Sequence, residues 1–243
     1  MVGADGTTRP LVANLICGSP GRNHDFDYAR LRLGQALYDA YGIRTDCFQD
    51  YEDSDAILGG DLLVSYTSQV AYSDAACAAL RRYLEGGGRW FALHASNSVL
   101  GNTIMPTILG TRFVTHPPYQ RFDVEVSRPD DPLLDGIAPF AIDDELYVIE
   151  TVAPDIEVLL HTRWGGTAFG NREIAVADHP LMYRRRIGEG GILYLALGHA
   201  NRPYDKPFAD RPDQPDHRGP WQLPAFNELV RRGIEWAAKR RPF

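Results

Sequence analysis

The sequence is poor in cysteine, has no long apolar run and carries no excess of positive charge, and each of these absences excludes a class of protein. Cys17, Cys47 and Cys77 are odd in number and widely spaced. This argues against a disulfide framework or a zinc knuckle and predicts buried, reduced thiols in a cytoplasmic protein. No stretch approaches the roughly 20 apolar residues of a membrane span, and the first nine residues lack the pattern of a signal peptide.

The formal net charge of -7 argues against a nucleic-acid partner, because binding to phosphates needs a basic surface. The hydrophobic fraction of 44% and the charged fraction of 23% are those of an ordinary globular protein. We therefore expect one domain over residues 10–243, preceded by a flexible tail at residues 1–9. No membrane partner is expected, and the composition leaves a homo-oligomer open.

Apolar runs and helical patterns alternate through the first hundred residues. The predicted strands cover residues 11–17, 43–48, 61–66 and 89–93, and the predicted helices cover residues 28–41 and 74–85. Such alternation favours parallel pairing with crossover helices. The sequence thus predicts an α/β fold, with a flavodoxin-like, doubly wound, mostly parallel sheet and helices on both faces.

The second half is less regular. Short strands are predicted at residues 122–126, 145–149, 156–160, 174–177 and 192–197, and a final helix at residues 226–237. The last strand is the candidate for a late central strand, and the others extend the sheet or form a flanking ribbon. Residues 200–222 contain five prolines, which argues against helix or interior strand and predicts an irregular C-terminal lid loop.

Histidine is the residue type most suggestive of function, since six of the seven histidines follow apolar, strand-like runs. Ligands of open α/β sheets bind beyond the carboxyl ends of the strands, so a histidine-rich cleft is expected there. His24 lies on a polar loop, where it has no packing role. His94 and His199 directly follow apolar strands; partial burial would keep His94 neutral, as a base or metal ligand requires.

Other candidates are less distinctive. His116 precedes two prolines that would hold it in a fixed direction. Glu145 and Tyr147 are expected to share one face of a strand, since they are two residues apart. His161 and His179, placed at the ends of short strands, and His217 rank lower. For each histidine the alternative is a core or loop imidazole that only bonds a neighbouring carbonyl.

Several phrases resemble the ThuA family in order and spacing. They are His24-Asp25-Phe26, Ser68-Gln69, Gly86-Gly-Gly-Arg-Trp-Phe-Ala-Leu-His94, Phe113-Val-Thr-His116, Asp144-Glu145-Leu-Tyr147, Gly188-Glu-Gly-Gly-Ile-Leu-Tyr-Leu-Ala-Leu-Gly-His199 and Gly233-Ile-Glu-Trp236. The resemblance implies a class I glutamine-amidotransferase-like fold and a role in carbohydrate use, with trehalose derivatives and 3-keto-glycosides as substrates. Amidotransferases of this fold carry a cysteine on the turn after a central strand, but no cysteine lies near His94, which argues against glutaminase chemistry.

The leading hypothesis is a carbohydrate-processing enzyme that uses histidine and carboxylate acid–base chemistry on a small sugar or keto-glycoside. The predicted catalytic residues are His24, His94, His199 and Glu145, and the predicted substrate-binding residues are Asp25, Gln69, His116, Tyr147 and Trp221. No cofactor is certain. A divalent metal such as zinc would take its ligands from His24, His94, His116, His199 and Glu145. Two alternatives stay open, a noncatalytic carbohydrate-binding or sensing module and a metal-dependent hydrolase of another small polar substrate.

Overall fold

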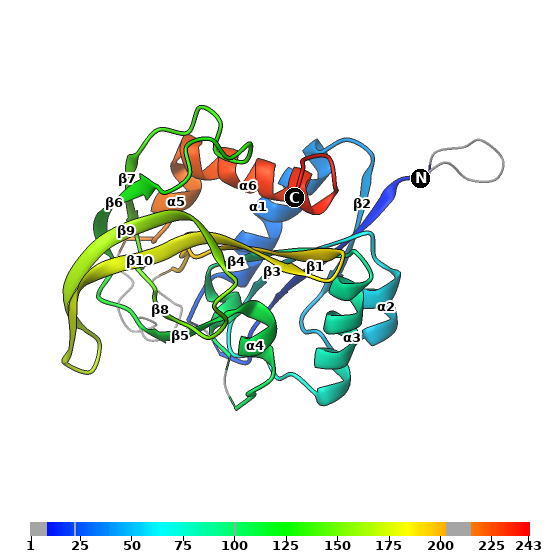
Figure 1. The fold of residues 1–243 in the computed structure, drawn as a ribbon, viewed down its shortest axis with the longest axis horizontal. Helices are drawn as coiled ribbons and strands as arrows, with labels where there is room; N and C mark the ends of the chain where they lie inside the picture. The colour runs from blue at the N-terminus through cyan, green and yellow to red at the C-terminus, as the bar shows by residue number, and fades with distance from the viewer. Residues whose placement is uncertain (1–8, 22, 100, 203–214) are drawn as a thin grey trace.

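The computed structural model describes residues 9–21, 23–99, 101–202 and 215–243, and its largest element is a nine-stranded mixed sheet (Figure 1). Five parallel strands form one half, in the order β2-β1-β3-β4-β11. Their bounds are β1 (Leu11–Gly18), β2 (Ile43–Phe48), β3 (Leu62–Thr67), β4 (Arg89–Leu93) and β11 (Gly190–Leu195). This is the flavodoxin-like strand order, so the predicted doubly wound sheet is confirmed.

Helices cover both faces of the parallel half, as predicted (Figure 1). On one face lie α1 (Phe26–Asp39) and α6 (Pro224–Ala237); on the other lie α2 (Ser54–Gly59) and α3 (Asp74–Glu85). Every residue of β3 and β11 is buried, as expected for strands covered on both sides. Helix α6 approaches β4 closely because residue 233 is glycine, where a Cβ would lie only 2.4 Å from the Phe91 ring.

Beyond β11 the sheet becomes antiparallel. It continues through β10 (Arg172–Ile187), β9 (Glu157–Ala168), β6 (Gln120–Val126) and β7 (Phe140–Asp144). β5 (Thr111–Thr115) and β8 (Val148–Thr151) form a separate two-stranded sheet. The second half therefore contains both a sheet extension and a flanking ribbon. β9 and β10 form a long curved hairpin, with Phe169 at its turn (Figure 1).

The structure corrects two predicted strand assignments. Residues 145–147 connect β7 to β8 and are not part of a strand, because the pairing of β7 with β6 ends at Asp144, whose carboxyl group accepts a hydrogen bond from the Glu145 backbone N–H. His161 and His179 lie inside β9 and β10 rather than at strand ends. The pairing of β10 with β9 shifts its register beside Pro180, which cannot donate to the ladder.

Short elements are harder to predict than long ones. Helices α2 and α4 (Met105–Leu109) and strand β5 have too few residues for a periodic pattern. The prediction that the proline-rich segment contains no helix is wrong, because α5 (Gly219–Gln222) forms there with Pro220 in its first turn, where a missing N–H costs nothing. Residues 203–214 of the predicted lid and residues 1–8 of the predicted tail lie outside the described residues. None of the helices within the described ranges has the length and apolar character that a membrane crossing requires.

The three cysteines are free thiols, but only two are buried. The prediction of burial is wrong for Cys47, because β2 is the edge strand and turns this side chain to solvent. Burial raises the pKa of the Cys17 thiol to about 12 and also raises the pKa of Cys77.

Alkylation of the native protein should therefore be confined to Cys47. We expect iodoacetamide at pH 8 to add one label to the native chain and three to the unfolded chain, as counted by intact mass, because a buried thiol of raised pKa supplies almost no thiolate. Cys47→Ser should remove the native label. Rapid labelling of Cys17 in the folded protein would contradict the packing of β1.

Candidate active site

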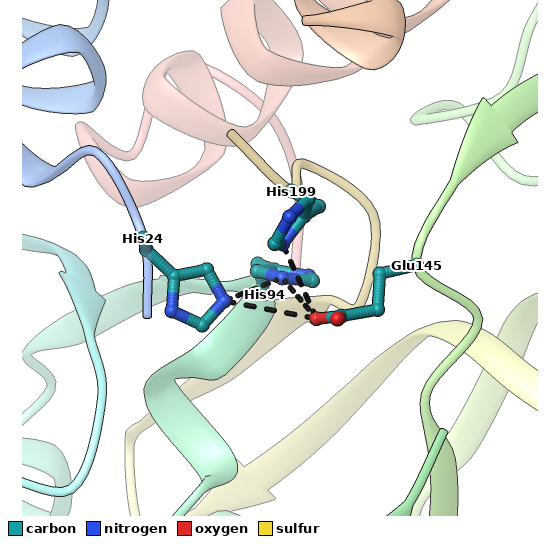
Figure 2. A group of neighbouring side chains, drawn as sticks. All are labelled: His24, His94, Glu145 and His199. Atoms are coloured by element: carbon teal, nitrogen blue, oxygen red, sulfur yellow. Dashed lines mark hydrogen bonds and ion pairs between the residues drawn. The ribbon is translucent and has the colours of Figure 1, made fainter. Parts of the chain in front are cut away.

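Four side chains converge at the carboxyl edge of the sheet (Figure 2). His24 follows β1, His94 follows β4 and His199 follows β11. Because these strands are parallel, their carboxyl ends meet at one edge, and the three imidazoles come together although they are far apart in the sequence. Glu145 comes from the antiparallel half, directly after β7, and its carboxylate lies among them (Figure 2).

The distances show how closely the imidazoles surround this carboxylate. Oε2 of Glu145 lies 3.2 Å from His199 Nδ1, 3.5 Å from His94 Nε2 and 3.8 Å from His24 Nε2. The other oxygen, Oε1, lies 2.9 Å from His116 Nδ1. His24 and His94 also meet, with 3.1 Å between their Nε2 atoms. The side chains of His24, His94 and His199 are at most 5% exposed, so this polar cluster is screened from water.

His94 occupies a sharp turn between β4 and a short 3-10 helix, η1 (His94–Asn97). Its φ of 46° lies in the left-handed region, which costs roughly 1–2 kcal/mol for a residue with a side chain. None of the three cysteines lies at this turn, as predicted from the sequence. The Nδ1 of His94 lies 2.7 Å from the Ala196 carbonyl oxygen and must donate to it, since a carbonyl only accepts. This bond fixes the tautomer and leaves the Nε2 lone pair directed at the cluster.

Asp144 connects the end of β7 to the loop that carries His199. Its Oδ1 accepts hydrogen bonds from the backbone N–H groups of Glu145 (2.8 Å) and His199 (2.9 Å), and its Oδ2 accepts one from Gly198 (2.8 Å). Gly198 has a φ of 125°, which a residue with a side chain rarely adopts, and this conformation carries the chain from β11 into the site. A fully buried carboxyl group thus links the end of β7 to the loop that bears His199.

The electrostatics of the cluster favour one ionised carboxylate among neutral imidazoles. Burial lowers the pKa of His24, His94 and His199, and the neighbouring Glu145 only partly opposes this. Burial alone would raise the pKa of Glu145, but its pKa is lowered well below the usual range because His199, His116 and His24 stabilise the ionised form. Because these groups interact strongly, their protonation steps belong to the cluster as a whole rather than to one residue.

A cavity of about 540 Å³ opens onto this cluster. Its wall combines aromatic rings with side chains that can donate and accept hydrogen bonds. The lining residues are Asn23, His24, Ser68, Gln69, Ser98, Phe113, His116, Pro118, Tyr119, Glu145, Tyr147, Phe169, His199, Asn201 and His217. Aromatic faces with polar groups between them suit the apolar faces and hydroxyl edges of a sugar.

Most of the predicted site residues are brought together. The cavity wall includes all of the predicted substrate-binding residues except Asp25 and Trp221, and His94 lies just behind it. Tyr147 packs its ring against His94, with 4.3 Å between ring centroids, and its hydroxyl lies 3.4 Å from His24 Nε2. The argument from a shared strand face is wrong, but Glu145 and Tyr147 do line the same cavity.

Asp25 and Trp221 lie behind the cavity within the described part of the chain. The carboxylate of Asp25 caps α1 by accepting from Tyr28 N–H and pairs with Arg218, at 2.6 Å. The indole of Trp221 is 3% exposed and donates to the Gly198 carbonyl, 2.9 Å away. Both residues therefore support the backbone next to His24 and His199.

Several wall residues cannot be found from the sequence. Tyr119 stacks on His217, with 4.1 Å between ring centroids. Phe169 reaches the cavity from the β9–β10 turn, packs on the His116 ring and donates its backbone N–H to the His116 carbonyl. No local pattern marks these residues, because their positions depend on how distant segments fold back. His217 alone has a signal, as a histidine in the proline-rich segment, and that signal is weak.

Comparison with known proteins agrees with this fold. The profile of a family described as ThuA, trehalose utilisation, matches residues 17–211. A search of curated proteins finds no match. A ThuA-like protein from Parabacteroides merdae is similar with a TM-score of 0.71 and 17% identity, over 96% of this chain and 91% of that one. Another ThuA-like protein, from Bacteroides uniformis, is similar with a TM-score of 0.66 and 19% identity, over 97% of this chain and 94% of that one.

The likeness extends to an amidotransferase-like protein. A GMP synthase subunit from Thermoplasma acidophilum has a TM-score of 0.56 at 12% identity, over 97% of this chain and 98% of that one. The predicted glutamine-amidotransferase-like fold is thereby confirmed. At these sequence identities, similarity to the solved structures supports the fold alone.

Proposed function

Because the chain belongs to the ThuA family, described by trehalose utilisation, we propose that it is an enzyme that cleaves an oxidised glycoside, such as a 3-keto derivative of trehalose, by acid–base chemistry. The observation that carries this proposal is the carboxylate of Glu145, only 12% exposed, with imidazoles on both of its oxygens at the base of a sugar-sized cavity. A carboxylate that holds neutral imidazoles in place is the arrangement that a histidine base needs.

The proposed cleavage starts from the ketone group of the substrate. A carbonyl group at C3 acidifies the hydrogen on C2, and a neutral imidazole can remove that proton. The C1–O bond then breaks, and its electron pair stays on the departing oxygen, which takes a proton from an acid. Water adds to the resulting double bond and completes the net hydrolysis. Glu145 stabilises each imidazolium that forms, so the same histidines can take and return the proton.

The cavity wall supports this substrate class. Gln69 has a φ of 56°, in the left-handed region, and its backbone N–H donates to the Ser98 carbonyl, so its side chain is held at the cavity by a strained backbone. Tyr119 and Phe169 offer aromatic faces on which a pyranose can stack.

The test is incubation of the purified protein with 3-keto-trehalose, with trehalose as the matched control. We expect the keto-glycoside to be cleaved to glucose and a keto-sugar, detected by mass, and trehalose to remain intact because it lacks an acidified C2 hydrogen. Cleavage of neither compound, together with measurable binding of the keto-glycoside, would overturn the proposal and indicate a sugar-sensing module.

A further inference from the structure

We propose that His24, His94, His199 and Glu145 form a binding site for one divalent transition-metal ion, with Zn²⁺ as the ion best suited to the donor set. Their donor atoms all lie within 4.8 Å of one another, and three of the four residues are buried. This deepens the proposed function and rests on it for the substrate, but the site itself follows from the geometry alone.

The distances match those of a coordination shell. Zinc binds imidazole nitrogen and carboxylate oxygen at about 2.0–2.2 Å, which places neighbouring tetrahedral ligands roughly 3.4 Å apart. Four of the six separations among these donors are 3.1, 3.2, 3.5 and 3.8 Å, and all six are within 4.8 Å. Figure 2 shows the imidazoles of His24 and His94 and the carboxylate of Glu145 facing a common region.

The Nδ1 atom of His199 supplies an independent observation. It is buried, its side chain is 4% exposed, and it makes no hydrogen bond although it lies 3.2 Å from Glu145 Oε2. Two polar atoms at that distance without a hydrogen bond are directed past each other. Ligands of one ion behave in this way, because each is directed at the ion rather than at its neighbour.

The surroundings also suit a metal. The Ala196 carbonyl accepts from Nδ1 of His94 and so presents its Nε2 lone pair, as outer partners of metal-bound histidines do. His116 lies on Oε1 of Glu145, opposite the oxygen that faces the other imidazoles, and orients the carboxylate.

An ion at this position would change the assignment of roles. With four protein ligands bound, a substrate oxygen would have to join as a fifth ligand, and the ion would then act as a Lewis acid that polarises a ketone. His24, His94 and His199 then hold the ion rather than the proton. His116, which lines the cavity next to Glu145, becomes the proton carrier.

The test measures metal binding without any sugar. The full chain is stripped with a chelator, dialysed and titrated with ZnCl₂, and its metal content is read by elemental analysis. We expect one Zn²⁺ per chain, and His24→Gln and His199→Gln should each lower affinity by at least about 100-fold. His217→Gln, which alters a wall histidine outside the ligand set, and His161→Gln should retain the ion.

Cobalt provides a second readout that does not depend on any variant. Co²⁺ bound to the unaltered protein should give the intense visible absorption of a four-coordinate site, and ZnCl₂ should displace it. The inference would be overturned if the unaltered chain failed to bind Zn²⁺, or if His24→Gln and His199→Gln bound it as tightly as the unaltered chain does. It would also be overturned by a Co²⁺ spectrum like that of the hydrated ion. Because no substrate is present, these results are independent of whether keto-glycosides are cleaved.

Discussion

Glu145→Gln should lower the rate of keto-glycoside cleavage by about 1,000-fold, since loss of a positioned acid–base system typically costs 10²–10⁴-fold. The amide keeps the shape of the carboxylate but removes the charge that stabilises each imidazolium as it forms beside His116 and His199. Because the surrounding histidines lower the pKa of Glu145, its ionised form also stabilises the fold, and some loss of thermal stability is expected as well.

The measurement is kcat and KM for the keto-glycoside alongside a thermal unfolding curve. Glu150→Gln is the matched control, because Glu150 lies on β8 with its side chain half exposed and paired to Arg112 on the surface. We expect the control to retain full activity. Retention of more than about a tenth of the activity by Glu145→Gln would show that the reaction centre lies elsewhere.

Asp144→Ala should destabilise the protein more than any other single change at the site. Three buried backbone N–H groups would lose their acceptor, and each unsatisfied group costs about 1–3 kcal/mol. We expect the free energy of unfolding to fall by roughly 3–6 kcal/mol and Tm to fall by about 10 °C or more. Chemical and thermal denaturation, each followed by circular dichroism, measure this directly.

The neighbouring residue provides the control for this prediction. Asp143 is half exposed and pairs with Arg121 on the surface, at 3.1 Å. Such a pair contributes at most about 1 kcal/mol, so Asp143→Ala should leave Tm almost unchanged. Similar Tm losses in the two variants would mean that the backbone N–H groups of Gly198 and His199 find other acceptors, and that Asp144 is not the link between β7 and the His199 loop.

The parallel half and the position of its histidines are predictable because their signals are local. Apolar runs closed by glycine or by a polar residue mark buried parallel strands, and the carboxyl ends of such strands must meet. His94 and His199 can therefore be placed at this edge without any knowledge of what lies between them. The position of His24 is harder to predict, because it lies six residues beyond β1 on a loop. Only the order of the strands brings that loop close to His94 and His199.

The antiparallel half is less predictable because its elements are defined by distant pairing. The sequence pattern places Glu145 at the cavity for a wrong reason, because the alternation after it predicts a strand, whereas residues 145–147 form a connection. Trp221 lies near the end of the proline-rich segment, where the sequence predicts a contact with the sugar, but its indole N–H donates to the Gly198 carbonyl. The position of Phe169 at the cavity depends on the length of the β9–β10 hairpin, which no local sequence pattern predicts.

The reaction centre joins the two halves of the sheet, and this has a consequence for refolding. The imidazoles come from the amino-terminal strands and from β11, whereas the carboxylate arrives only with β7. A folding intermediate with a complete parallel half would hold the histidines without their acid and would be inert. Recovery of catalysis after dilution from denaturant should therefore lag behind the recovery of helical circular dichroism, with the closing of the Asp144 link as the final step.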